Sequence, residues 1–100
     1  TVSALQSEYE ALLKQQETHL QTLLLKKQKN EQLLKYYTSS ALPQAKLIAD
    51  NANQQFASGA ISYLDWIILT NQAIGIRAEF INAVSEWNAT MIELNVYLNN

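Results

Sequence analysis

Apolar side chains recur every three or four residues along the first part of the chain, from Val2 to about Tyr37. This spacing is typical of one face of a helix. The apolar positions are Val2, Leu5, Tyr9, Leu12, Leu20, Leu23, Leu24, Leu34 and Tyr37. Polar residues occupy the same stripe at Gln16, Lys27 and Asn30. The pattern therefore predicts a long helix with a coiled-coil seam that contains polar gaps.

The segment "TSSALPQA", Thr38–Ala45, interrupts this helix. Pro43 has no backbone N–H, so a helix must either restart here or bend. The helical spacing resumes at once at Leu42, Ala45, Ala49, Ala52 and Phe56. We therefore predict a first helix over about 2–57 with a kink near 38–43, and its small residues would let another helix approach closely.

A short turn over about 58–61 is predicted next. Gly59 can adopt the positive φ that ends a helix, and Ser62 stands three residues before Asp65 as the start of a capping box. A second helix is predicted over about 62–98. Its main stripe is Trp66, Leu69, Ala73, Ile76, Phe80, Ala83, Trp87, Met91, Leu94 and Tyr97.

A second apolar stripe lies beside the main one on this helix. It consists of Ile67, Ile74, Ile81, Val84 and Met91. One antiparallel partner cannot cover both stripes, so we expect the helix to sit between two neighbours and the chain to self-associate. A strand over "AISYLDWIIL" is disfavoured because alternation fails at Trp66–Leu69. The predicted fold is all-α, with residues 1–100 forming a single long antiparallel helical hairpin, similar to a coiled coil.

Composition supports helices and narrows the function. Two glycines and one proline in 100 residues leave little room for turns. The net charge is −2 and only Arg77 is basic after Lys46, which disfavours nucleic acid binding. There is no cysteine, and the most apolar window, "WIILTNQAIGI", is too short and too polar for a membrane helix. Because the chain begins in mid-pattern without Met, it looks like a fragment of a longer protein.

Chemically reactive side chains are sparse. His19 is the only histidine and has no converging ligands, so we expect no metal site. Glu79, Glu86 and Glu93 recur every seven residues and predict one solvated or inter-helix face. Gly75, inside the second helix, is expected to permit close helix contact. No catalytic residue and no cofactor is predicted, and the chain is not expected to be an enzyme.

The region Leu42–Leu98 resembles the second-repeat hairpin of the TolC-like outer membrane efflux proteins. The similarity lies in the tip, "FASGAISYLDW", and in the aromatic-Asn…Leu ending of the second helix. The matching positions are Ala52, Phe56, Gly59, Ile61, Ser62, Leu64, Asp65, Gln72, Arg77, Phe80, Ala83, Trp87, Asn88 and Leu94. Within the family, the chain is most similar to the heavy-metal CusC/CzcC-like branch or to a C-terminal domain fused to a CzcA/CusA-like pump.

This resemblance implies that the chain is part of a trimeric α-helical barrel in the periplasm of a Gram-negative cell. Its partners would be a membrane-fusion adaptor and an inner membrane pump of the RND type. Its cargo would be heavy-metal cations. It would contact the membrane only through other parts of the parent protein. The implied adaptor-docking or gating tip consists of Phe56, Ser58, Gly59, Ala60, Ile61, Ser62 and Asp65. Ile61 stands where some members have an arginine, so the ion pair that latches those tips is not expected here.

Two other functions fit the same pattern. The hairpin could belong to a periplasmic membrane-fusion adaptor, in which case lipoyl-like β segments would flank it in the full-length gene. It could also be a generic coiled-coil or four-helix-bundle interaction module, which would be encoded as a stand-alone soluble protein.

Overall fold

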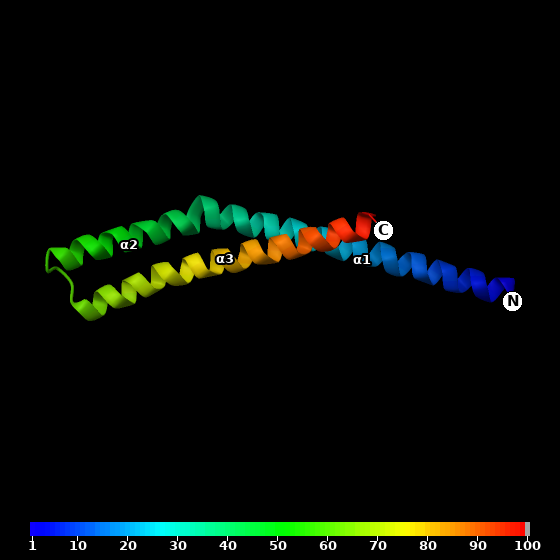
Figure 1. The fold of residues 1–100 in the computed structure, drawn as a ribbon, viewed down its shortest axis with the longest axis horizontal. Helices are drawn as coiled ribbons and strands as arrows, with labels where there is room; N and C mark the ends of the chain where they lie inside the picture. The colour runs from blue at the N-terminus through cyan, green and yellow to red at the C-terminus, as the bar shows by residue number, and fades with distance from the viewer. Residues whose placement is uncertain (100) are drawn as a thin grey trace.

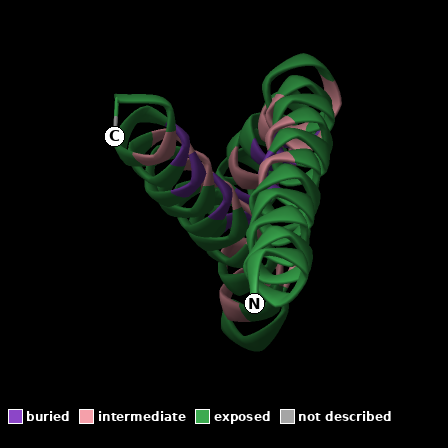
Figure 2. Cartoon of the chain, turned by 90° about the vertical axis from the view of Figure 1, so that its right-hand side faces the viewer, coloured by how far each residue is buried: buried purple, intermediate pink, exposed green. Residues whose placement is uncertain are grey.

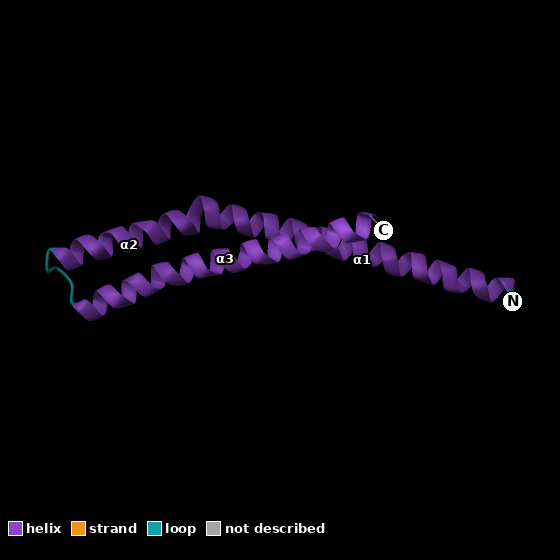
Figure 3. Ribbon diagram, viewed as in Figure 1, coloured by secondary structure: helices purple, strands orange, loops and turns teal. Residues whose placement is uncertain are grey.

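The computed structural model describes residues 1–99 as an all-α antiparallel hairpin (Figure 1). One arm contains helix α1, Val2–Tyr36, a π-helical turn η1, Tyr37–Ala41, and helix α2, Leu42–Ala57. The other arm is helix α3, Tyr63–Asn99. The molecule is 82 Å long and at most 21 Å across (Figure 3). The predicted antiparallel hairpin is confirmed, and no strand occurs within residues 1–99.

The predicted kink near 38–43 coincides with the π-helical turn η1. The backbone N–H of Leu42 donates to the carbonyl oxygen of Tyr37, the i to i+5 bond of a π-helix. Hydroxyl groups support the turn, because Thr38 and Ser39 both donate to the carbonyl oxygen of Lys35, at 3.2 and 2.6 Å. Pro43 then falls in the first turn of α2, where a missing N–H is tolerated.

The π-turn has a geometric reason in the packing stripe. Tyr37, Ala41 and Ala45 are separated by two successive four-residue steps, which would drift off one face of a regular helix. A π-turn takes up more residues than an α-turn and cancels that drift. Ala41 and Ala45 consequently both stay buried against α3.

Small side chains make up most of the fully buried apolar residues between the arms. The buried apolar residues are Leu23, Ala41, Ala45, Ala52, Ala73, Ala83 and Leu94, and five of these seven are alanines. In Figure 2 the buried residues lie on the sides of the two arms that face each other. The predicted close approach of another helix to the alanines of α2 is therefore made by α3.

The main apolar stripe of α3 faces the other arm, as predicted. All ten of its positions, from Trp66 to Tyr97, are buried or half-buried. The second stripe is covered only in part: Ile67, Val84 and Met91 are half-buried, whereas Ile74 and Ile81 are 54% and 63% exposed. The hairpin alone therefore leaves part of the second apolar face of α3 without a neighbour.

A buried polar layer joins α1 to α3. Asn30, one of the predicted gaps in the seam, is only 7% exposed and donates from Nδ2 to Thr90 Oγ1 at 3.0 Å. The same amide lies 3.5 Å from the carbonyl oxygen of Glu86. Because any sliding of the helices would leave these groups unpaired, this layer favours one register over the others.

The open end of the hairpin is uneven. Tyr97, near the end of α3, donates a hydrogen bond to the carbonyl oxygen of Gln16, and its ring lies 5.4 Å from the ring of His19. The first part of α1 extends beyond this point (Figure 1). The seam residues of this part are Val2, Leu5, Tyr9 and Leu12. They are 58–76% exposed, because nothing in residues 1–99 covers them.

We expect Ala52→Leu to destabilise the hairpin by about 1–3 kcal/mol, because the fully buried alanine leaves no room for three more carbon atoms. Urea unfolding followed by circular dichroism measures the change. Ala78→Leu, at an exposed position of α3, is the matched control and should leave the midpoint nearly unchanged. Equal midpoints for the two variants would show that the alanine contact does not limit the approach of the helices.

The polar layer is tested by a double-mutant cycle. Asn30→Ala should lower the free energy of unfolding by about 1–3 kcal/mol, because the Thr90 hydroxyl loses its partner. Combination with Thr90→Val should reveal a coupling of about 1 kcal/mol between the two positions. Strictly additive effects would mean that the two side chains do not act together.

Candidate functional site at the hairpin tip

The turn at Ser58–Ser62 ends α2 with a Schellman motif. The N–H of Gly59 donates to the carbonyl oxygen of Phe56 at 3.1 Å, and the N–H of Ala60 donates to that of Gln55 at 2.8 Å. Gly59 has φ = 79°, the left-handed conformation that the sequence analysis assigned to it. The last carbonyl groups of α2 are therefore satisfied within the turn itself, which gives the tip a defined shape.

Ser62 starts the second arm. Its Oγ accepts a hydrogen bond from the backbone N–H of Asp65 at 3.1 Å, which is the predicted N-cap interaction. The Asp65 carboxyl group lies in the first turn of α3, where the helix dipole favours negative charge. Asp65 is exposed, so it presents its charge to solvent beside the turn.

Three aromatic rings are stacked just behind the turn. The ring centroids of Phe56 and Trp66 are 5.3 Å apart with nearly parallel planes, and those of Tyr63 and Trp66 are 5.9 Å apart. The Trp66 Nε1–H donates to Asn53 Oδ1 at 2.8 Å, which holds the indole against α2. We call Phe56, Tyr63 and Trp66 the tip aromatic cluster.

The structure brings most of the predicted site residues together at one end of the molecule. Ser58, Gly59, Ala60, Ser62 and Asp65 are exposed there, and Ile61 is half-buried. Phe56 is 40% exposed and belongs to the tip aromatic cluster. The chain thus presents a compact surface in which backbone, hydroxyl and aromatic groups are all accessible.

Sequence reasoning missed three contributors to this surface. Trp66 was assigned only to the packing stripe, while Tyr63, 63% exposed, and Asn53 were not singled out. The available signal was the spacing of Tyr63 and Trp66, which places two aromatic rings on one face of the first helical turn. The contact of both with Phe56 depends on the turn geometry and could not be read from spacing.

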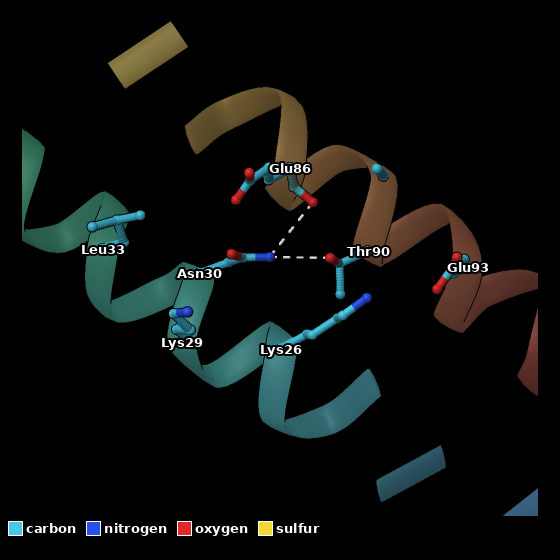
Figure 4. A pocket seen from close by; sticks show the side chains of 8 residues that line it. Lys26, Lys29, Asn30, Leu33, Glu86, Thr90 and Glu93 are labelled. Atoms are coloured by element: carbon cyan, nitrogen blue, oxygen red, sulfur yellow. Dashed lines mark hydrogen bonds between the residues drawn. The ribbon is translucent and has the colours of Figure 1, made fainter. Parts of the chain in front are cut away.

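A second concave surface lies between α1 and α3, around the buried polar layer (Figure 4). Its lining residues are Lys26, Lys29, Asn30, Leu33, Glu86, Ala89, Thr90 and Glu93. Lysines from α1 face glutamates from α3 across it, so the charges balance and no single ionic ligand is favoured. The Asn30 amide is already bonded to Thr90. We therefore interpret this groove as part of the polar layer between α1 and α3.

Glu79, the first of the three regularly spaced glutamates, contacts the other arm. The Tyr37 hydroxyl donates to Glu79 Oε2 at 3.1 Å, and the Tyr37 ring packs edge-on against Phe80. Desolvation raises the pKa of the Tyr37 phenol above its ordinary value, and the bond to the Glu79 carboxylate raises that pKa further. Tyr37 thus stays a neutral donor. Glu79, Glu86 and Glu93 are all exposed, and the Glu79 carboxylate also bonds to the other arm, so the face predicted to be solvated or inter-helix is mainly solvated.

Clusters of metal-ligating side chains and membrane-spanning helices are both absent from the described residues. Within residues 1–99, no group of three or more histidine, aspartate or glutamate side chains lies close enough to hold a metal ion. None of the helices in that range has both the length and the apolar content needed to cross a membrane.

The two glycines are expected to respond in opposite ways to alanine. Gly59→Ala should destabilise the hairpin by about 1–2 kcal/mol because of its positive φ. Gly75→Ala should instead stabilise it by about 0.5–1 kcal/mol, since a Cβ there meets no atom within 4 Å. Thermal unfolding of both variants measures the difference. A neutral Gly59→Ala would contradict the turn geometry described above.

Comparisons with protein-family models, with curated proteins and with solved structures find no match for this chain. The resemblance to the TolC-like outer membrane efflux proteins therefore rests on the residues of the tip and of the second helix.

Proposed function

We propose that this chain is the periplasmic α-helical hairpin of an outer membrane efflux channel in a tripartite RND-type export system, with heavy-metal cations as cargo. The observation that carries the proposal is the tip: a closed, well-defined turn with an exposed aromatic cluster at the end of an 82 Å hairpin. Length and placement together suit a protein that reaches across a compartment to meet a partner end-on.

The tip has the composition of a docking surface. Aromatic side chains dominate the energy of many protein interfaces because they bury a large area with little loss of side-chain freedom. Tyr63 and Phe56 remain partly exposed, while the bond from Trp66 to Asn53 fixes the third ring in place. A hairpin tip of a membrane-fusion adaptor is the partner that this surface would take in such a system.

The outer face of α3 supports placement in a wall of helices. Its exposed isoleucines, including Ile74 and Ile81, need a lateral neighbour that the hairpin does not supply. In the proposed channel that neighbour is another hairpin of the trimeric barrel. Transport is then passive: the channel conducts what the pump delivers, and opens by shifts of packed helices. Selection of the metal would lie in the pump.

The test is made in the bacterium that encodes the chain, by chromosomal replacement of Phe56 and Tyr63 with alanine. We expect a several-fold fall in the highest tolerated concentration of at least one of zinc, cobalt and copper ions. The reason is that the pump would lose its connection to the outer membrane channel. Tyr9→Ala, which removes an exposed aromatic ring at the opposite end of the hairpin, is the matched control and should leave tolerance unchanged. Immunoblots verify equal amounts of protein.

A photo-reactive phenylalanine analogue at Tyr63 identifies the partner in the same cells. A cross-link to an adaptor that has lipoyl-like β segments supports the proposal. A cross-link to an outer membrane channel would instead make this chain the adaptor hairpin. Unchanged metal tolerance after deletion of the entire gene would overturn the proposed cargo.

A further inference from the structure

The α1–α2 arm departs from regular α-helical bonding at one level along the hairpin. Within η1 the regular i to i+4 bonding is replaced by π-type bonding, and the hydroxyls of Thr38 and Ser39 take over part of the acceptor capacity of the preceding turn. Pro43, just after it, contributes no N–H at all. Sharp bends in helices occur at such π-turns and prolines.

The α3 arm carries a glycine at the same level. Tyr37 bonds to Glu79 on one side and Asn53 bonds to Trp66 on the other, so the antiparallel register places Gly75 opposite residues 41–44. Glycine in a helix interior destabilises it by about 0.5–1 kcal/mol relative to alanine. The close helix contact expected at Gly75 is not made within the hairpin, because a Cβ there would meet nothing within 4 Å.

The arms pack closely at this level, but only through small side chains. The buried residues there are Ala41, Ala45 and Ala73, whose side chains have no torsions to lock and little surface to interdigitate. Among residues 1–99, no side-chain hydrogen bond joins the arms between the Tyr37–Glu79 pair and the Asn53–Trp66 pair. Bending would therefore break no specific polar contact.

We propose that the hairpin contains a hinge at this level, formed by η1 and Pro43 in one arm and by Gly75 in the other. The tip part, α2 with the start of α3, swings as a unit relative to the base part, α1 with the rest of α3. The tip aromatic cluster and the Asn30–Thr90 layer lie on opposite sides of the hinge, and each keeps its own geometry. This inference goes beyond the proposed function and does not rest on it.

Because both arms must bend together, stiffening either one should stiffen the hairpin. The chain has no cysteine, so Gln28→Cys and Asp50→Cys place two nitroxide labels on exposed positions on either side of η1. The labelled positions lie about 33 Å apart along the helix, at 1.5 Å per residue. Pulsed electron paramagnetic resonance then gives the distribution of their separation in the purified chain.

The labelled parent should give a broad distribution. Gly75→Ala should narrow it although that residue lies in the unlabelled arm, and Pro43→Ala should narrow it further. Ser85→Ala, at an exposed position of α3 outside the hinge, is the matched control and should leave the width unchanged. Amide hydrogen exchange around Gly75 should slow by roughly two- to fivefold in Gly75→Ala and stay the same in Ser85→Ala.

All substitutions are to alanine in a helix, so the variants are expected to fold. Equal widths in the parent, Gly75→Ala and Pro43→Ala would overturn the hinge. A second outcome would also overturn the hinge. If Gly75→Ala leaves the width of the distance distribution unchanged but abolishes self-association, measured by analytical ultracentrifugation, the glycine serves a contact with another copy of the chain. Metal tolerance plays no part in this test, so its outcome is independent of the proposed function.

Discussion

Burial of small side chains between the two arms is the constraint on which the rest of the hairpin depends. Ala41, Ala45 and Ala52 in one arm and Ala73 and Ala83 in the other are all buried, which lets the helix axes approach closely and leaves little core volume. A seam of such small side chains gives little preference for one register. Register must therefore come from elsewhere, and the structure supplies it at intervals: the stacked rings at the tip, the Tyr37–Glu79 bond, and the Asn30–Thr90 layer.

Periodicity predicted the helices, the reversal and the covered face of α3, because each of these follows from where apolar side chains fall on a helix. The positive φ of Gly59 and the cap at Ser62 followed from local residue chemistry in the same way. The π-turn was only indicated as a kink, since Pro43 signals an interruption without giving its geometry. Asn30 was recognised as a gap, but its partner Thr90 depends on the register of two distant segments.

The candidate site was predicted in part for the same reason. The turn residues are consecutive, so their grouping is already contained in the sequence, whereas the cluster of Phe56, Tyr63 and Trp66 requires the two helices to meet at a particular angle. Gly75 shows the converse case. A glycine in a helix was given the usual packing role, and the open space around its Cα shows that the hairpin itself does not use it in that way. The family resemblance adds a function to this geometry and remains a proposal.

The exposed isoleucines on α3 would have a consequence for symmetry if a second copy of the chain covered them. One copy would then match this surface to a different surface of the next copy, unless two copies paired face to face. Head-to-tail contacts of that kind either close into a ring or continue as an open filament. For such a chain, the angle between neighbouring hairpins decides between a closed wall with a lumen and unlimited growth, and a small bend along the hairpin is enough to change that angle.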